Sequence, residues 1–147
     1  MKYFKLLNKK DIKKLNLQLK RQFDNEFDFK SYLVYKTPKN RVYIVNKEFS
    51  KLDKNKLKIN NIGLYIFSIE DDGLRFSIDG SQMFKAKKNI IELNEKQFKE
   101  WMTGNNLDIK TEKGYYIIKY KDYFLGCGKS SGEKVYNYVP KERRVVF

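Results

Sequence analysis

Apolar residues recur at intervals of three or four positions near the start of the chain, at Ile12, Leu15, Leu19 and Phe23. This interval places them on one side of a helix. Asn8 and Asp11 precede the run, three residues apart, in the way that an N-terminal capping pair does. The pattern predicts a helix of about fifteen residues, with lysines over much of its remaining surface.

Two short runs of aromatic and β-branched residues follow, at residues 31–36 and 41–46. The residues between them, Thr37-Pro38-Lys39-Asn40, have the composition of a turn, so we expect the two runs to pair as a hairpin. The helix and the hairpin together amount to a small α+β unit. We assign this unit to residues 1–57, because a polar, lysine-rich stretch at residues 51–58 then interrupts the pattern.

The second part of the chain, residues 58–147, has the pattern of short strands. An apolar run at residues 59–69 and an alternating run at residues 74–78 flank Asp71-Asp72-Gly73, which is a tight-turn signal. Further strands are expected at residues 89–93 and in the runs that start with Tyr115, Tyr123 and Val135.

A short helix is expected among these strands. Asn94 and Gln97 have the spacing of a capping box, and Gly104 stands where a C-terminal cap prefers glycine. The buried side of this helix would consist of Phe98, Trp101 and Met102. The pattern therefore predicts an α+β fold, in which a small, mostly antiparallel β-barrel with short helices is preceded by the small α+β unit.

The charge of the chain is strongly positive and unevenly distributed. Its 147 residues include 32 Lys and Arg against 18 Asp and Glu, a formal net charge of +14. Residues 1–57 hold 16 basic and 6 acidic residues, residues 58–112 hold 8 and 9, and residues 113–147 hold 8 and 3. A domain this basic most often binds nucleic acid, and less often an anionic membrane or an acidic protein. Lysine-rich chains also arise from genome composition or from adaptation to heat.

The residue types needed for catalysis are scarce. The chain has no histidine, and Cys127 is its only cysteine, so Ser–His pairs, Cys–His pairs and internal disulfides are excluded. We therefore expect no enzyme, no cofactor and no metal site. No apolar run approaches the roughly eighteen residues of a membrane span, and a single cysteine fits a reducing compartment, so we expect a cytoplasmic protein.

The segment Gly126-Cys127-Gly128-Lys129 is the clearest candidate for ligand binding. Its glycines stand too close together for a P-loop. They would nevertheless let the backbone approach a ligand, in a turn that presents amide groups and the Lys129 cation together. The same residues are also common in a turn without any ligand.

Three other features are candidates for the same surface. Asp79-Gly80-Ser81 is expected to form a sharp turn close to Arg75 in the sequence. The basic run at residues 141–144 is followed by apolar residues 145–147, which would hold it in place as a strand; a solvated tail is the alternative. Some of the many tyrosines must line the core, whereas others would face outward and stack on bases.

The segments Leu125-Gly-Cys-Gly-Lys129 and Asn137-Tyr-Val-Pro-Lys141-Glu-Arg143 resemble the C-terminal PUA-like domain of Sun-family RNA cytosine-5 methyltransferases. Ile62-Gly-Leu-Tyr-Ile66 and residues 74–81 are similar to other marks of this group, and of its stand-alone archaeal-type branch of small ribosome-biogenesis proteins. The resemblance covers residues 58–147 well and residues 1–57 loosely, as a pre-PUA unit. The glycine-rich adenosylmethionine loop and the paired Pro-Cys and Thr-Cys cysteines of the methyltransferase domain are absent from this sequence.

The resemblance implies RNA binding without the methyl-transfer reaction. The RNA-binding residues that it and the surrounding pattern predict are Arg75, Gly126, Gly128, Lys129, Asn137, Lys141, Arg143 and Arg144. The implied ligand is structured ribosomal or transfer RNA, with an RNA-modifying enzyme or a pre-ribosomal particle as a further partner. The alternative is the RNA-targeting subunit of a split RNA cytosine-5 methyltransferase that acts with a separate catalytic chain. A purely protein-binding module is disfavoured by the basic ends.

Overall fold

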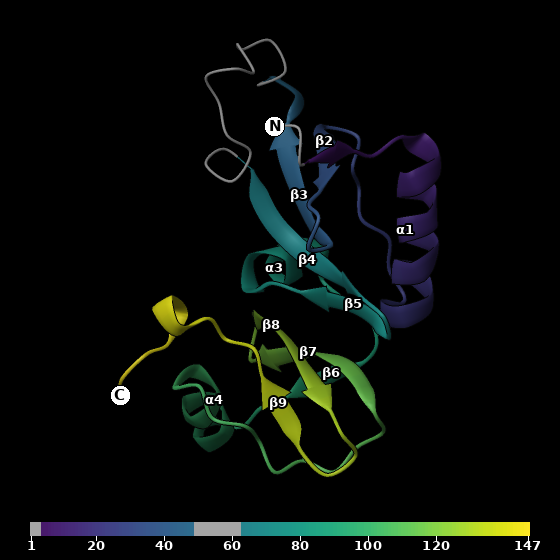
Figure 1. The fold of residues 1–147 in the computed structure, drawn as a ribbon. Helices are drawn as coiled ribbons and strands as arrows, with labels where there is room; N and C mark the ends of the chain where they lie inside the picture. Colours follow the sequence, from purple (N-terminus) through teal and green to yellow (C-terminus); the bar gives the residue numbers. More distant parts are fainter. Residues whose placement is uncertain (1–3, 49–62) are drawn as a thin grey trace.

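The computed structural model of the protein describes residues 4–48 and 63–147. These residues form two β-sheets and three α-helices (Figure 1). The first sheet has five antiparallel strands, in the order β1 (Lys5–Leu6), β2 (Tyr32–Lys36), β3 (Arg41–Asn46), β4 (Leu64–Glu70) and β5 (Gly73–Phe76). The second sheet has four strands, in the order β6 (Ile90–Glu92), β7 (Gly114–Tyr120), β8 (Tyr123–Ser130) and β9 (Val135–Asn137). The helices are α1 (Lys9–Phe23), α3 (Ile78–Phe84) and α4 (Glu95–Met102), and a 3₁₀ turn, η2, spans Lys141–Arg143.

Helix α1 begins where the sequence predicts. The side-chain oxygen of Asn8 accepts a hydrogen bond from the Asp11 backbone (2.9 Å), and the Asp11 carboxylate accepts one from the Asn8 backbone (3.1 Å), which completes the capping box. The helix ends at Asp24, whose φ of 57° lies in the left-handed region. The apolar stripe that predicted the helix is buried, because Leu19 and Phe23 are fully enclosed in the core.

The predicted hairpin is confirmed, and its second strand continues the sheet. Strands β2 and β3 pair around the predicted turn, in which Asn40 has a φ of 59°. Strand β3 then pairs with β4, and β4 pairs with β5 across the turn at Asp71 and Asp72. The first sheet therefore joins strands from both sides of the expected boundary at residues 57 and 58. The boundary itself and the start of the apolar run at residues 59–69 lie outside the described residues.

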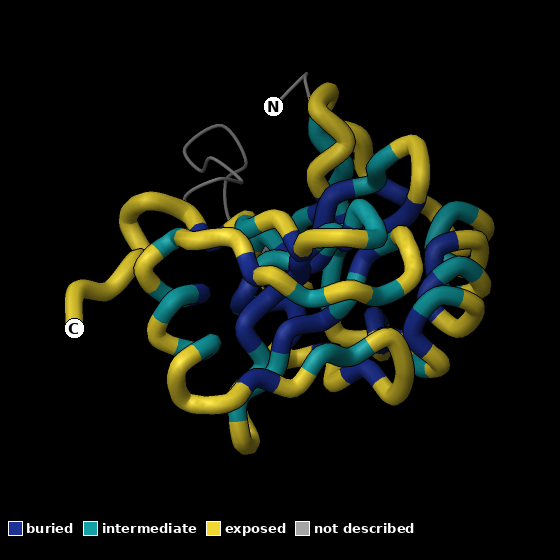
Figure 2. Tube along the Cα trace, turned by 90° about the horizontal axis from the view of Figure 1, so that it is seen from below, coloured by how far each residue is buried: buried dark blue, intermediate teal, exposed yellow. Residues whose placement is uncertain are grey.

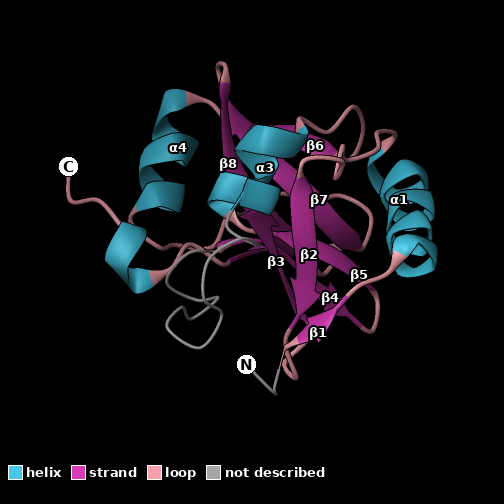
Figure 3. Cartoon of the chain, turned by 90° about the horizontal axis from the view of Figure 1, so that it is seen from above, coloured by secondary structure: helices cyan, strands magenta, loops and turns pink. Residues whose placement is uncertain are grey.

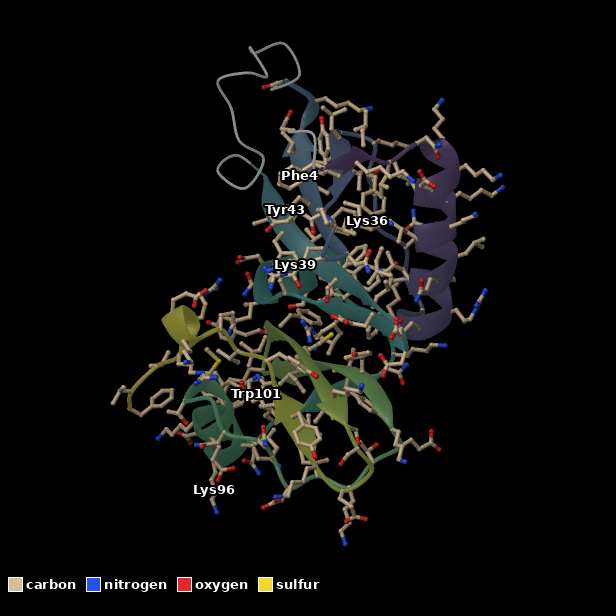
Figure 4. The ribbon with its side chains drawn as sticks, in the orientation of Figure 1. Phe4, Lys36, Lys39, Tyr43, Lys96 and Trp101 are labelled. Carbon is tan, nitrogen blue, oxygen red and sulfur yellow. The ribbon has the colours of Figure 1, made fainter. Side chains whose placement is uncertain are left out.

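Helix α4 is confirmed with its capping box. Asn94 and Gln97 exchange side-chain-to-backbone hydrogen bonds of 2.8 and 3.0 Å. The indole of Trp101 is completely buried between α4 and the second sheet, whereas Lys96 of the same helix points away from the molecule (Figure 4). Gly104, with a φ of 98°, follows the helix as the sequence pattern predicts.

The expected β-barrel is not closed among the described residues, which form two separate sheets instead. The reason is that β4 pairs on one side with β3 of the N-terminal hairpin and on the other with β5, so it has no free edge for the second sheet, and β5 forms the edge of the first sheet. The second sheet is also mixed, because β6 runs parallel to β7 while the other pairs are antiparallel. Two buried contacts join the halves: the Phe76 backbone N–H donates to the Cys127 Sγ (3.1 Å), and the Gly126 N–H donates to the Ser81 Oγ (2.9 Å).

Asp79-Gly80-Ser81 lies in helix α3 and not in the predicted sharp turn. The Ser77 hydroxyl caps this helix by accepting from the Gly80 N–H (3.0 Å), and it donates to the Tyr65 carbonyl of β4 (2.7 Å). Gly80 packs directly on the backbone of Ile66, where a Cβ atom has no room. The glycine that suggested a turn therefore serves the close packing of a helix on a strand.

The segment from Gly126 to Lys129 lies inside strand β8 and not in a turn. Gly126 has a φ of 83°, and it sits opposite an irregularity in β7 between Ile117 and Lys119, where the register of the two strands shifts. A β-bulge with a positive φ favours glycine just as a turn does. The sequence pattern around a glycine therefore does not distinguish a bulge from a turn.

The C-terminal residues 145–147 do not form the expected strand. They are nevertheless held against α4. The Val145 N–H donates to the Met102 carbonyl (2.9 Å), and the Phe147 ring lies 5.9 Å from the Phe98 ring. The basic run before them is thus placed by these contacts and by the η2 turn.

The hydrophobic core consists of two clusters. The first combines α1 and the hairpin with β4, β5, Phe84 and parts of β7 and β8. The second lies between α4 and the second sheet and is built from residues 78–139 alone. Buried segments accordingly run through the middle of the molecule in Figure 2, and Figure 3 shows α1 and α4 on opposite sides of the strands. Whether residues 58–147 fold alone stays a prediction. No helix in the described part of the chain is long and apolar enough to span a membrane.

Candidate nucleic-acid interface

A groove of about 280 Å³ opens where the first sheet, the start of α3, strand β8 and the C-terminal segment meet. We call it the junction groove, and its polar and aromatic lining includes Arg41, Tyr65, Arg75, Ser77, Tyr138 and Arg143. Three of the five arginines of the chain thus reach one groove from β3, β5 and η2. One basic residue of the N-terminal segment and one of the C-terminal segment therefore line this groove.

Arg75 is the most firmly held of these cations. Its guanidinium lies 3.4 Å from a Glu70 carboxylate oxygen, and Glu70 in turn accepts a hydrogen bond from the Ser68 hydroxyl (2.8 Å). The guanidinium carbon is 4.1 Å from the centroid of the Tyr138 ring, which is cation–π distance. Burial would lower the pKa of Arg75, but the Glu70 carboxylate together with the Tyr65 and Tyr138 hydroxyl groups outweighs burial, and the pKa is raised. A charged, oriented guanidinium plane results.

Arg41 and Arg143 are more exposed. Arg41 lies 5.3 Å from the centroid of the Tyr65 ring on the neighbouring strand. Arg143 donates to the Asp79 carboxylate of α3 at 3.3 Å, which fixes the η2 turn against that helix. Both side chains can move toward a ligand at small cost, because exposed ion pairs and cation–π contacts contribute only about 1 kcal/mol or less.

Lys129 lies beside the junction groove and is not among its lining residues. Its ammonium is 2.6 Å from the Asp72 carboxylate and 5.3 Å from the centroid of the Tyr115 ring. The hydrogen bond from Lys129 lowers the pKa of Asp72, and the same bond raises the pKa of Lys129. Tyr115, whose hydroxyl also hydrogen-bonds Asp72, has a raised pKa, mainly through burial.

The two glycines of β8 are packed against other residues. The Gly126 N–H is already donated to Ser81, and a Cβ at position 126 would lie 3.2 Å from the Ile78 backbone nitrogen. A Cβ on Gly128 would lie 2.8 Å from the Trp101 ring. Gly126 lines the junction groove, whereas Gly128 faces the second hydrophobic cluster.

Asn137 and Arg144 brace the C-terminal segment. The Asn137 amide donates to the carbonyls of Trp101 (2.8 Å) and Asn105 (2.9 Å), and its oxygen accepts from the Val139 N–H (2.8 Å). Arg144 donates to the Val139 carbonyl at 3.2 Å. Lys141 is exposed on η2. Of the residues predicted from the sequence, Arg75, Gly126 and Arg143 are therefore the ones that the structure brings together in the junction groove.

Arg41 and Tyr65 were not predicted as site residues. Both stand on strands that the sequence did predict, but their neighbourhood depends on β3 pairing with β4 and on the register shift between Val42 and Tyr43. A pairing across the expected domain boundary gives no local signal in the sequence. Tyr138, by contrast, is one of many tyrosines in the sequence, and the alternation of inward and outward positions along a strand does not identify it as the one that lines the groove.

Three of the candidate cations each form an ion pair with one carboxylate. Glu70 pairs with Arg75, Asp72 with Lys129 and Asp79 with Arg143, and all three acids belong to the β4–β5–α3 segment. In the described part of the chain, no group of three or more His, Cys, Asp or Glu side chains is arranged as metal ligands. The acids thus hold the cations of this surface in place and compete with an anionic ligand for them.

Asp79→Asn is expected to strengthen binding to a polyanion by roughly two- to fivefold, because it frees Arg143 from an exposed ion pair. Fluorescence anisotropy with a labelled RNA hairpin measures the change. Asp108→Asn is the matched control, since it removes the same charge from the exposed pair with Lys134, which lies outside the junction groove. Equal gains in the two variants would mean that net charge alone is responsible.

Cys127 is buried in β8, and burial raises its pKa to about 12. A thiol of this kind is protonated at neutral pH and is a poor nucleophile. We expect a thiol reagent at pH 8 to label the folded protein at least ~100-fold more slowly than the denatured protein. Cys127→Ser should leave RNA affinity nearly unchanged. Rapid labelling of the folded protein would contradict the burial of this group.

The fold and the junction groove together define a basic α+β protein with an arginine- and tyrosine-lined surface. Residues 88–145 match a protein family described as the Methyltransferase RsmF PUA domain. This segment corresponds to the second sheet, α4 and the C-terminal basic run, and it lies within residues 58–147, for which the sequence predicts a PUA-like domain.

The chain is also distantly similar to bacterial proteins named ribosomal RNA small subunit methyltransferase F. It is 27% identical to the protein of Aliivibrio fischeri (strain ATCC 700601 / ES114) over 134 residues, which cover 88% of this chain and 26% of the relative. The identity is 27% over 96 residues for Vibrio campbellii and 28% over 93 residues for Aeromonas salmonicida, in each case 20% of the relative. The chain thus spans about a fifth to a quarter of these relatives, in the region that includes their PUA domain.

Proposed function

We propose that the protein binds structured RNA without catalysing a reaction, and that it acts on ribosomal or transfer RNA in ribosome biogenesis or RNA modification. The observation that carries this proposal is the convergence of Arg41, Arg75 and Arg143 on one groove that also presents two tyrosine rings. Phosphate groups are bound by arginines in this kind of arrangement, and bases stack on tyrosines. The similarity of residues 88–145 to a PUA domain supports the same conclusion.

The proposal includes finer statements from the sequence. We infer a PUA-domain protein with a pre-PUA unit at residues 1–57, which adds Arg41 to the groove, and a PUA-like RNA-binding domain at residues 58–147. Of the remaining predicted contacts, the cations Lys129, Lys141 and Arg144 would bind phosphates around the junction groove, and Gly128 and Asn137 would support the strand and segment that carry them. Phosphate contacts position an RNA without reading its sequence, which agrees with a surface rich in lysine.

The salt dependence of RNA binding tests this proposal. A variant with Arg41, Arg75 and Arg143 all changed to Gln should bind an RNA hairpin at least ~tenfold more weakly at moderate salt. Its log–log slope against salt should be smaller in magnitude by roughly one unit or less per lost phosphate contact. A second variant with Lys129 and Lys141 changed to Gln tests the flanking cations in the same assay.

The matched control removes the same number of charges from helix α1, through Lys13→Gln, Lys14→Gln and Lys20→Gln, at exposed positions. Circular dichroism confirms that each variant folds. If the helix variant loses as much affinity and slope as the arginine variant, the junction groove is not the binding face. If the wild type has no affinity for any RNA at low salt, the function itself is excluded.

A second candidate function is the RNA-targeting subunit of a split RNA cytosine-5 methyltransferase. The observation in its favour is that the similar proteins are named methyltransferases and that the chain matches only 20–26% of them. Tagged protein recovered from its own cells separates the two functions by mass spectrometry. Stoichiometric recovery of a chain with a cytosine-5 methyltransferase domain favours the second function, whereas ribosomal particles or RNA without such a chain favour the first.

A further inference from the structure

The junction groove is small, and its size limits what it can hold. Its volume of about 280 Å³ is at the lower end of the ~300–1,000 Å³ that is usual for small-molecule sites. An RNA helix cannot enter a space of this size, whereas one flat ring system with its attached sugar can. The groove therefore fits a single nucleotide better than it fits the backbone of a duplex.

The walls of the groove have the chemistry of a base-stacking site. The Arg75 guanidinium carbon lies over the Tyr138 ring, 4.1 Å from its centroid, and the Arg41 guanidinium carbon lies over the Tyr65 ring at 5.3 Å. Tyr138 is 39% exposed, so part of its surface is open to a ligand. Tyrosine rings and arginine guanidinium planes are the surfaces on which proteins stack unpaired bases.

The floor and the rim of the groove differ in polarity. Phe76, Ile78 and Leu125 supply apolar surface at its base and are buried. Arg143 is exposed on η2, and Arg41 is exposed on β3. An apolar floor between aromatic walls suits a base placed inward. Arg41 and Arg143 line the groove together with the Asp79 and Glu142 carboxylates, so a phosphate placed outward would compete with Asp79 for Arg143.

Arg75 is preset for this role before any ligand binds. Its ion pair with Glu70 and its half-buried position fix the guanidinium plane over Tyr138, so little side-chain entropy is lost when a base stacks there. A surface lysine would offer the same charge without the plane. Base stacking at this position is therefore expected to require arginine, and lysine should not replace it.

We propose that the junction groove binds one unpaired nucleotide, with its base between the Arg75–Tyr138 and Arg41–Tyr65 pairs and its phosphate beside Arg143. This inference rests on the proposed RNA-binding function and names the feature of the RNA that is recognised. The preferred ligand is then a stem that carries a bulged or looped-out nucleotide, and the phosphate contacts outside the groove hold the adjoining stem.

Three RNA hairpins of equal length and charge test this inference in fluorescence anisotropy. All three share the same loop; the stem of the first is fully paired, the stem of the second carries a single-nucleotide bulge, and the stem of the third carries an abasic residue in the bulge. The wild type should prefer the bulged RNA over both others by about tenfold, because the abasic residue keeps the phosphate and loses the stacking base. Equal affinity for all three, with binding still present, would overturn the inference and leave the proposed function standing. No binding to any of them at low salt would instead exclude the proposed function.

Point variants assign the preference to the groove. Tyr138→Leu and Arg75→Lys should each abolish the preference for the bulge, measured as the ratio of the affinities of the same variant for the bulged and the paired hairpin. Tyr138→Phe keeps the ring and should keep the preference, which separates stacking from folding. Tyr136→Leu is the matched control, since Tyr136 is equally exposed on β9 but does not line the groove. A preference that survives in Tyr138→Leu, or that is lost in Tyr136→Leu as well, would contradict the assignment.

A free nucleotide carries the same base and phosphate groups as an unpaired nucleotide of an RNA, so it is the alternative ligand for the groove. Adenosine and uridine 5′-monophosphate at millimolar concentration should reduce binding of the bulged hairpin toward the level of the paired one and should not affect the paired hairpin. Micromolar binding of either monophosphate, measured by calorimetry together with no preference for the bulge, would make a free nucleotide the ligand and overturn the RNA inference.

Discussion

Replacing Gly80 by alanine is expected to destabilise the protein by about 3 kcal/mol or more, or to prevent folding. A Cβ at this position would overlap the backbone carbonyl of Ile66 in β4. A backbone neighbour cannot rotate away as a side chain can, so helix α3 must shift from the strand. Urea unfolding followed by circular dichroism measures the loss.

The shift would also disturb the junction groove, because α3 carries Ser77, its N-terminal cap, and Asp79, the partner of Arg143. Met83→Ala is the matched control, since Met83 lies in the same helix and is 41% exposed. That variant should change the free energy of unfolding by less than about 1 kcal/mol. A Gly80→Ala protein as stable as the Met83→Ala protein would show that α3 does not need this close approach.

Local elements of the fold could be predicted from the sequence because their signals are local. Helix α1 has its apolar stripe and its capping box within sixteen consecutive residues, and α4 repeats the pattern with Asn94 and Gln97. The β2–β3 hairpin and the β4–β5 turn depend on short-range turn chemistry. The apolar residues that predicted the two helices are largely buried, whereas the turn residues Pro38, Lys39 and Asn40 are exposed.

The arrangement of these elements could not be predicted in the same way. Gly80 and Gly126 both suggested turns, since a glycine signals freedom of the backbone and not the use that the fold makes of it. The closed barrel failed because strand pairing is a long-range choice, and β4 pairs with the N-terminal hairpin. The same choice brings Arg41 beside Tyr65 and so completes the junction groove.

A fragment of residues 58–147 is expected to retain only part of the cooperative fold. The second hydrophobic cluster, around Trp101 and Ile118, draws all of its buried residues from within this fragment. The first cluster does not, because Leu19, Phe23 and Val42 of the N-terminal part enclose Phe67 and Leu74. Removing residues 1–57 would expose these two side chains and leave β4 without its neighbour β3.

Hydrogen exchange and urea unfolding of the fragment measure this outcome. We expect protected amides in β7, β8 and α4, rapid exchange in β4 and β5, and a broad transition with a smaller urea dependence than the length of the fragment predicts. The residue 57/58 boundary would be supported by one sharp transition with all strands protected, because residues 58–147 would then fold as an independent unit.

In the full-length chain, Leu19→Ala and Trp101→Ala probe the two clusters separately, and each should lower the free energy of unfolding by about 3 kcal/mol or more. If the clusters form one cooperative unit, both variants lower the midpoint of a single transition. If they unfold independently, Trp101→Ala leaves the protection of β4 and β5 unchanged, and the division of the chain lies between the two clusters.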